Sequence, residues 1–322
     1  MRSFTVVMYH YVRPISASKY PRIRGLELAD FEGQLEYIEQ HYSVISLATL
    51  LAAKESGAPL PPRSLLLTFD DGYIDHHRYV APALARRKLT GLFFPTASAV
   101  IARKILDVNK VHFILATATD TDTLIAHIES AVESCRPECD LLSLAEYRAN
   151  LWQPSRFDSA NIIYIKRMLQ VALPLTLRSR IVDELFSLFV TKDEEGFADE
   201  LYLSEEDIRS MVGHGMEIGS HGYDHRWLDR LTESEQADDI DRSLSMLKRA
   251  GVDTKRFSFC YPYGAYSSAT LELLRARHCA AAFTTNVALA NIDADFLELP
   301  RIDTNDLPKR GDAVSSAREA MA

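Results

Sequence analysis

Short apolar runs alternate with amphipathic segments along most of the chain. The apolar runs are typical of strands buried on both faces, and we predict them over 4–8, 64–69, 91–95, 216–220, 257–261, 280–284 and 296–301. Helical periodicity between them predicts helices over 77–88 and 233–250, and Gly251 suits a left-handed C-cap after the second. Strands that alternate with helices indicate an α/β fold, built as a covered parallel sheet or as a barrel.

The alternation is interrupted between about residues 107 and 200, where apolar stripes at helical spacing follow one another. Two such stripes are Ile162, Ile165 and Leu169, and then Leu177, Ile181, Leu185 and Leu188. Because the strand pattern resumes afterwards, we predict a mainly helical insertion within a single domain that spans 1–322. A separate helical domain is the alternative.

Composition places the chain among globular proteins, with 47% hydrophobic and 25% charged residues over 322 positions. The 36 basic and 45 acidic residues give a formal charge of −9, so nucleic acid is not an expected partner. We find neither a run of about 18 apolar residues for a membrane span nor the pattern of a secretory signal. We therefore expect a cytoplasmic protein with free thiols at its four cysteines. The sequence specifies no oligomeric state.

The predicted strand at 64–69 leads directly into Asp70, Asp71 and Gly72. Two adjacent carboxylates are costly so near a core. A bound dication changes this, because one carboxylate can coordinate it while the other remains a charged base. The alternative is an exposed turn that caps the next helix.

His221 and His225 follow the predicted strand at 216–220. If the chain is helical there, imidazoles four residues apart lie on one face and can bind one ion. Together with Asp71 they form a set of two histidines and one carboxylate that leaves room for water and substrate. The alternative for the histidine pair alone is a chance arrangement on the surface.

The predicted strand at 257–261 runs into a Pro-Tyr-Gly turn. Pro262 and Gly264 would fix a sharp bend that directs the Tyr263 backbone N–H toward a developing oxyanion. Neighbouring tyrosine rings such as Tyr261 would offer a flat surface to a sugar. The alternative is an ordinary loop.

These three segments, in this order, resemble the polysaccharide deacetylase family with its NodB homology domain, which is carbohydrate esterase family 4-like. Residues 68–72 match the family's Thr-Phe-Asp-Asp-Gly motif in full, His221 and His225 match its His-x3-His motif, and 262–264 match its third motif in part. The resemblance covers 1–106 and 201–305. It implies a distorted (β/α) barrel of about seven parallel strands that binds a divalent metal. We expect Zn²⁺, with Co²⁺, Ni²⁺ or Fe²⁺ as alternatives.

The resemblance also implies roles for individual residues. The expected general base is Asp70, the expected metal ligands are Asp71, His221 and His225, and the Tyr263 N–H is expected to stabilise the tetrahedral intermediate. The expected substrate-binding residues are Tyr261, Pro262, Gly264 and Arg301. The expected reaction removes the acetyl group from an amino sugar, as a precursor or component of a bacterial surface polysaccharide.

Several positions depart from the family pattern. Gly222 stands where Ser or Thr usually follows the first motif histidine, so we expect a hydrogen bond that braces this loop to be absent. Cys260 stands where an arginine often orients the aspartate base. Arg301, at the end of another predicted strand, is a candidate substitute, and a surface arginine is the alternative.

The family's C-terminal Leu-x-His motif, which carries the general acid, is also missing. His10 closes the first predicted strand, and this resembles a branch of the family whose catalytic histidine lies near the N-terminus, including deacetylases that act on poly-N-acetylglucosamine. In a closed barrel the first and last strands are neighbours, so either can supply this position. We therefore predict His10 as general acid, with a buried core histidine as the alternative.

Two rival functions remain beside N-deacetylation. The first is hydrolysis of a non-sugar amide or a cyclic ureide, because the His-Gly-x2-His variant at residues 221–225 is also similar to relatives of that kind. The second is a saccharide-binding protein that has kept the fold and lost turnover.

Overall fold

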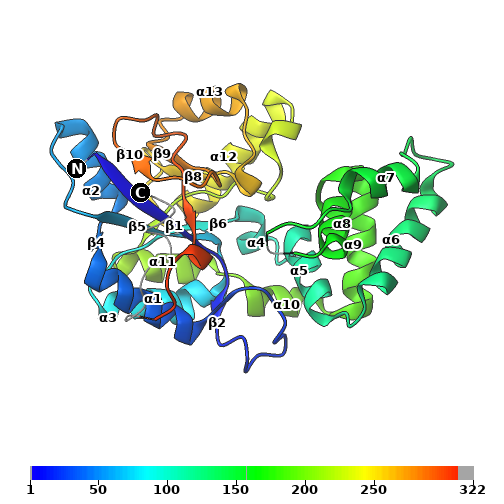
Figure 1. Ribbon diagram of the computed structural model, residues 1–322. Coiled ribbons are helices and arrows are strands. Elements are labelled where there is room, and N and C mark those ends of the chain that lie inside the picture. Colours follow the sequence, from blue (N-terminus) through cyan, green and yellow to red (C-terminus); the bar gives the residue numbers. More distant parts are fainter. Residues whose placement is uncertain (1, 157, 311–322) are drawn as a thin grey trace. The chain divides into compact units, whose positions relative to one another are not determined.

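The computed structural model describes residues 2–156 and 158–310 (Figure 1). Backbone contacts divide the chain into two compact units. Unit 1 consists of Met1–Pro14, Gly25–Lys104 and Ala198–Ala322, as far as these segments are described, and unit 2 of Ile15–Arg24 and Ile105–Phe197. The organisation as a single domain with an insertion stays a prediction.

Unit 1 contains short strands that are mostly parallel. They are β1 (Ser3–Tyr9), β2 (Val12–Arg13), β3 (Leu26–Glu27), β4 (Ser43–Val44), β5 (Ser64–Asp71), β6 (Leu92–Pro95), β7 (Glu217–Ile218), β8 (Ser258–Cys260), β9 (Ala281–Phe283), β10 (Ala290–Asn291) and β11 (Ile302–Asp303). The main sheet has the order β10-β1-β5-β6-β7, with β11 also paired to β1 and β4 to β5. β2 with β3 and β8 with β9 form two further parallel pairs.

The predicted α/β class is confirmed, but the predicted barrel of about seven parallel strands is not. The main sheet is mixed, because β10 runs antiparallel to β1. The β8–β9 pair is joined to its neighbours by single parallel bridges, between Ser220 and Phe259 on one side and between Phe283 and Leu299 on the other. The strand predicted at 296–301 is wrong: β11 begins after it, and Pro300 has no N–H to donate to a ladder.

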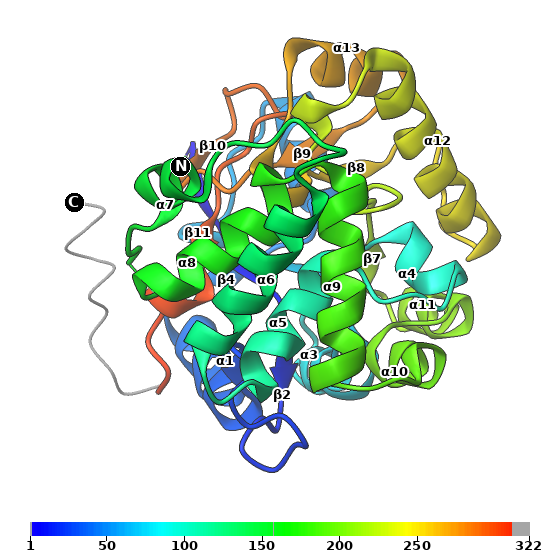
Figure 2. The same cartoon turned by 90° about the vertical axis from the view of Figure 1, so that its right-hand side faces the viewer.

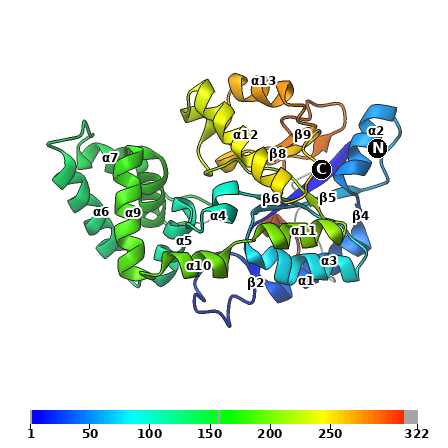
Figure 3. The same cartoon turned by 180° about the vertical axis from the view of Figure 1, so that it is seen from behind.

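Helices lie on both sides of the main sheet. They are α1 (Leu28–His41), α2 (Leu47–Ser56), α3 (Ala81–Arg86), α4 (Ala97–Ile101), α11 (Glu205–Gly213), α12 (Glu233–Arg249) and α13 (Ser268–Ala276). Figures 1 and 3 show α12 and α13 on one side of the strands and α1, α3 and α11 on the other. The helix predicted at 77–88 is a π-helical turn, His76–Val80, that continues into α3. Gly251 has the predicted left-handed conformation after α12, with a φ of 83°.

Alternate residues of the central strands belong to two different hydrophobic layers. Val7 and Phe69 pack in one layer with residues of α1, whereas Val6 and Leu66 pack in another with residues of β9. All eight residues of β5 are buried. Because side chains alternate along a strand, Asp70 shares the face of Leu66 and points into the protein interior.

Unit 2 is helical throughout its regular structure as described. Its helices are α5 (Asp107–Thr117), α6 (Thr121–Cys135), α7 (Leu144–Leu151), α8 (Ala160–Arg167) and α9 (Leu175–Phe189), with a π-helical turn at Met168–Ala172. α10 (Glu194–Leu201) contains the boundary between the units. α6, α8 and α9 lie side by side (Figure 2). Most of the two predicted stripes is buried, but Leu188 is 62% exposed and does not belong to the packed face.

Segment 15–24 joins unit 2, which the predicted boundaries do not include. The ring of Tyr20, for example, packs edge-on against Phe113 of α5. Across the described residues, none of the helices is both long enough and apolar enough to cross a membrane.

Candidate active site and metal centre

The end of β5 places Asp71 beside both motif histidines. Oδ1 of Asp71 lies 3.3 Å from Nε2 of His221 and 3.3 Å from Nε2 of His225, and all three side chains are buried. The backbone turns sharply here, with φ of 75° at Asp71 and 77° at Gly72. A Cβ at Gly72 would lie 2.7 Å from Cα of Pro95, so the turn requires glycine. The three residues predicted to bind a metal are therefore together.

These three side chains fit a divalent cation. Their ligand atoms all lie within 4.8 Å of one another. Nδ1 of His221 donates to the backbone oxygen of Cys260 at 2.7 Å, so in the neutral imidazole Nε2 carries the free lone pair and faces Asp71. Oδ1 of Asp71 is buried and accepts no hydrogen bond in the described part of the chain. Two imidazole nitrogens and one carboxylate oxygen are a donor set that suits zinc and leaves a position for water.

A second group with metal-ligand chemistry, Asp70, His221 and Cys260, is a poorer candidate. Its ligand atoms also lie within 4.8 Å of one another. However, Nη2 of Arg301 lies 2.8 Å from Oδ2 of Asp70 and 3.1 Å from Sγ of Cys260. Because a guanidinium stays charged, it would repel a cation at this point. The cation is therefore best placed at Asp71.

The electrostatics around Asp71 favour positive charge. Burial opposes the charged carboxylate, but the adjacent imidazoles of His221 and His225 outweigh burial and hold the pKa of Asp71 well below its usual value. Burial also opposes a charged His221, yet Cys260 and Asp71 raise the pKa of His221 well above its ordinary value. For His225, burial lowers the pKa and the contact with Asp71 offsets this only in part. The hydroxyl of Tyr73 donates to Oδ2 of Asp71 and holds the carboxylate from its other oxygen.

Asp70 is bound by Arg301 instead. Nη1 of Arg301 donates to Oδ1 of Asp70 at 2.9 Å and Nη2 donates to Oδ2 at 2.8 Å. The same arginine donates to Oγ1 of Thr68 and to the carbonyl oxygen of Thr284. Arg301 is 1% exposed, which excludes the alternative of a surface arginine. Burial raises the pKa of Asp70, but Arg301, His221 and His10 together lower it to about 2, so the carboxylate is charged at neutral pH.

His10 follows β1 and lies at the open side of this site. Its Nε2 is 3.9 Å from Oδ2 of Asp70, and its side chain is 43% exposed, so it is not a buried core histidine. The backbone oxygen of His10 accepts a hydrogen bond at 3.0 Å from Nε2 of His76, which is fully buried. Burial lowers the pKa of His76 to about 4, so His76 stays neutral and acts as a donor.

The Pro-Tyr-Gly turn places Tyr263 against the metal site. Its φ is 58°, and its ring packs edge-on against His225 and stacks on Trp227, with ring centroids 4.6 Å apart in both pairs. Gly264 has a φ of 71°, and a Cβ there would lie 2.2 Å from Oγ1 of Thr285. This crowding explains why the turn carries glycine.

The other predicted substrate-binding residues are less accessible. Pro262 is buried. Tyr261 is 1% exposed, and its hydroxyl donates to the backbone oxygen of Leu297. Neither side chain is therefore open to solvent.

The structure adds residues that the sequence reasoning did not assign. Tyr73 and His76 contact Asp71 and His10 respectively, and Trp227 stacks on Tyr263. Tyr73 directly follows the Asp-Asp-Gly motif, so its position next to the motif was the available signal. No spacing rule in the sequence pointed to His76 or Trp227.

One protein family and several solved structures resemble this chain. The family model described as polysaccharide deacetylase matches residues 184–281, which contain both motif histidines and the Pro-Tyr-Gly turn. The predicted resemblance to the polysaccharide deacetylase family is confirmed. The matched stretch does not contain Asp70 and Asp71. The fold brings Asp71 next to the motif histidines of the matched stretch.

A curated polysaccharide deacetylase also matches part of the chain. Over 98 residues the chain is 28% identical to the poly-beta-1,6-N-acetyl-D-glucosamine N-deacetylase of Escherichia coli strain K12. The matched region is 30% of this chain and 14% of the relative, so the chain spans only a small part of the relative's length.

Solved deacetylase structures cover nearly the whole chain. The Streptococcus pyogenes deacetylase PplD, in complex with acetate, has a TM-score of 0.59 and 15% identity, covering 95% of this chain and 93% of that one. IcaB from Ammonifex degensii has a TM-score of 0.54 and 20% identity, covering 94% and 92%. A de-N-acetylase from Aggregatibacter actinomycetemcomitans has 0.54 and 14%, covering 99% of each chain. The chain therefore shares the fold of these deacetylases.

Proposed function

We propose that the protein is a metal-dependent hydrolase that removes the acetyl group from an N-acetylated amino sugar. The observation that carries this proposal is the meeting of Asp71, His221 and His225 at one buried point, with Asp70 and His10 directly beside it. The family match supports a deacetylase, and the name of the Escherichia coli relative supports an N-acetylglucosamine-containing substrate.

Asp71, His221 and His225 would hold the metal, for which Zn²⁺ is our first choice and Co²⁺, Ni²⁺ and Fe²⁺ are alternatives. When bound, such a dication polarises a carbonyl oxygen and lowers the pKa of a coordinated water toward about 7. Tyr73 fixes the second oxygen of Asp71, so this ligand keeps one orientation.

The remaining residues supply proton transfer and charge stabilisation. Asp70 accepts a proton from the water that attacks the acetamide carbon, and the Tyr263 backbone N–H donates to the carbonyl oxygen as that oxygen gains negative charge. Protonated His10 gives its proton to the nitrogen when the carbon–nitrogen bond breaks. The products are acetate and a free amine. The water gives its OH to acetate, and the proton taken up by Asp70 is released to solvent while His10 takes up a proton from solvent for the next turnover.

Arg301 acts in this scheme as a positioning residue for Asp70. Its bidentate contact fixes the carboxylate and keeps it charged, although a pKa near 2 makes Asp70 a weak base. We assign Tyr261, Pro262 and Gly264 to the shape of the turn, and the half-buried rings of Tyr263 and Trp227 to contact with a sugar ring. Two points stay predictions: that the sugar is a precursor or component of a surface polysaccharide, and that the protein is cytoplasmic.

The test is acetate release from a panel of N-acetylhexosamines and their oligomers by the metal-stripped chain, before and after Zn²⁺ or Co²⁺ is added. We expect acetate and free amine in equal amounts, only with metal and not with Asp70→Asn. Ring opening of a cyclic ureide without acetate release would instead favour the rival hydrolase. Saturable binding of the sugars without any product would favour the binding protein.

A further inference from the structure

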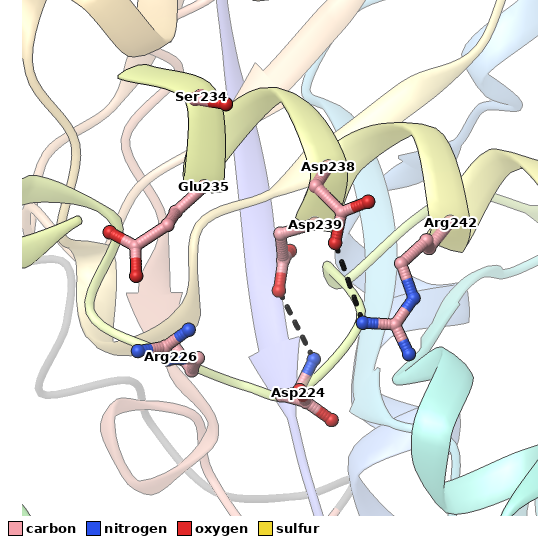
Figure 4. Close-up of a pocket in the computed structure, with 7 residues that line it drawn as sticks. All are labelled: Asp224, Arg226, Ser234, Glu235, Asp238, Asp239 and Arg242. Atoms are coloured by element: carbon pink, nitrogen blue, oxygen red, sulfur yellow. Dashed lines mark hydrogen bonds and ion pairs between the residues drawn. The ribbon is translucent and has the colours of Figure 1, made fainter. Parts of the chain in front are cut away.

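The loop between the two motif histidines is held by helix α12. Asp239 of this helix is 5% exposed. Its Oδ1 accepts the backbone N–H of Tyr223 at 2.8 Å, and its Oδ2 accepts the backbone N–H of Asp224 at 3.2 Å. In Figure 4 the Asp239 side chain points from the helix to the backbone at Asp224, whereas the adjacent Asp238 points toward Arg242. One buried carboxylate thus binds two successive N–H groups of the loop.

Helix α4 binds the carbonyl groups of the same loop. The backbone N–H groups of Ala97 and Ser98 donate to the carbonyl oxygens of Gly222 at 3.1 Å and Tyr223 at 2.8 Å. The loop backbone is therefore fixed through its donors by α12 and through its acceptors by α4. Of these contacts, only those from Asp239 come from a side chain, so a single substitution can remove them.

Gly222 makes the approach of Asp239 possible. Its φ is 74°, and a Cβ at this position would lie 2.6 Å from Oδ1 of Asp239. An L side chain would therefore be strained and would also displace the carboxylate. The brace that we expected to be missing at this glycine is supplied from α12 instead.

His225 depends on this loop more than His221 does. The ring of His221 is fixed directly by the hydrogen bond from Nδ1 to Cys260. Nδ1 of His225 is buried and has no hydrogen-bond partner within the described chain, and its ring is held by edge-on contacts with His221 and Tyr263. The position of His225 is therefore set largely by its backbone, which directly follows Asp224.

We propose that Asp239 is a positioning residue for the metal site, which holds the loop so that Nε2 of His225 meets Oδ1 of Asp71. Gly222 is the matching residue that leaves room for the carboxylate. This inference rests on the proposed function, because it concerns affinity for the metal. Asp239 acts through the backbone and contacts none of the three ligands.

The experiment measures Zn²⁺ affinity of the full chain, stripped of metal, by competition with a chromophoric chelator. Asp239→Asn keeps the shape of the side chain but replaces one acceptor oxygen by an NH₂ group. Because changes in the partners that orient metal ligands commonly weaken binding by about 10–100-fold, we expect a loss of that size. We also expect a changed visible spectrum of bound Co²⁺ and faster amide hydrogen exchange in the peptide that contains 221–225.

Asp238→Asn is the matched control. Asp238 is the adjacent carboxylate on the same helix. It is 66% exposed and forms an ion pair with Arg242 (Figure 4), so all three readouts should match the wild-type chain. Gly222→Ala is the second variant, which should weaken Zn²⁺ binding while Asp239 itself is intact. Its effect should be smaller in an Asp239→Ala background, because the clash with the carboxylate is then gone.

Wild-type Zn²⁺ affinity in Asp239→Asn would overturn the inference and leave the proposed function standing. An equal loss of affinity in Asp238→Asn would also overturn it, because the effect would then be one of general charge. A wild-type chain that binds neither Zn²⁺ nor Co²⁺ would overturn the proposed function and the inference together. If Asp239→Asn does not fold by circular dichroism, Gly222→Ala decides by the same criterion.

Discussion

The two neighbouring carboxylates Asp70 and Asp71 lie in different chemical surroundings. Asp70 faces the permanent cation of Arg301 inside the protein, whereas Asp71 faces two imidazoles whose charge depends on a proton or a metal. The difference arises from the backbone. Successive residues of β5 point to opposite faces, so the side chains of Asp70 and Asp71 diverge, and the positive φ of Asp71 turns the chain at the strand end. One strand end thus presents two acids in two different electrostatic settings.

From this comparison we propose different roles for the two acids. The partner of Asp70 is Arg301, a side chain of the protein that does not exchange with solvent. Asp70 therefore cannot bind a metal cation in its place and can only accept or release a proton. The partners of Asp71 leave Oδ1 without a hydrogen bond, so Asp71 can bind an exchangeable cation. Pairs of titratable groups in unlike environments are how one site separates such tasks.

The most direct way to break the comparison is to neutralise each acid in turn. Asp71→Asn should lose the metal and all metal-dependent turnover, because a ligand carboxylate is gone. Asp70→Asn should keep the metal and lose about 10²–10⁴-fold in kcat, the usual contribution of a general base. Metal content after dialysis and acetate release measure the two effects separately. Equal metal loss in both variants would show that the acids do not differ in role.

His10 is the partly exposed residue next to Asp70, and its replacement tests the proposed acid. His10→Ala should lower kcat for an N-acetyl sugar by about 10²–10⁴-fold, because the departing amine then lacks a proton donor. An acetate ester with a nitrophenol leaving group needs no such donor, so its hydrolysis should fall far less. A similar loss for both substrates would mean that His10 acts in binding or in structure and not as the acid.

The sequence predicted the residues of the site better than the way in which they are held. Asp70, Asp71, His221 and His225 follow strand ends in short motifs, and parallel strands bring their carboxyl ends together, so convergence could be inferred. We named Arg301 as a candidate partner of Asp70, although the strand that we predicted before it is wrong. Its distance of 231 residues from Asp70 gives no local signal.

The remaining failures have a similar physical cause. The regular barrel was not confirmed because pairing near β8 and β9 depends on single bridges, which apolar runs do not reveal. Asp239 looks like a polar position of an amphipathic helix and is in fact buried against a loop. Long-range contacts made by single polar side chains carry no periodicity, so pattern reasoning does not find them.

Replacing Arg301 tests whether its positive charge keeps Asp70 ionised and stabilises the folded chain. Arg301→Leu should lower the free energy of unfolding at neutral pH by about 3–5 kcal/mol, because a buried carboxylate loses its partner. In the wild-type chain the pKa of Asp70 is about 2, below its unfolded value, so this stabilisation is present above pH about 4 and is lost as the pH falls toward 2. In the variant burial should raise that pKa, so the acid limb of activity should move to higher pH.

Denaturant unfolding and the pH profile of kcat/KM measure these two changes. Arg301→Lys is the conservative control: it keeps a charge but cannot form the bidentate pair, so an intermediate stability is expected. If Arg301→Leu changes neither the stability nor the acid limb of activity, then Arg301 does not set the charge of Asp70, and the proposed difference between Asp70 and Asp71 is wrong.

His76 gives the smallest expected effect and concerns the support of His10. Its pKa is lowered to about 4 by burial, so below pH about 6.5 the unfolded chain takes up a proton that the folded chain refuses. Unfolding free energy should therefore fall by about 3 kcal/mol between pH 6.5 and 4 on account of this residue. His76→Gln should remove this part of the slope, measured by denaturant unfolding at several pH values. His77→Gln is the matched control, because the adjacent His77 is 34% exposed and pairs with Asp207 at the surface. The same dependence of unfolding free energy on pH in the wild-type chain and both variants would show that burial does not keep His76 neutral.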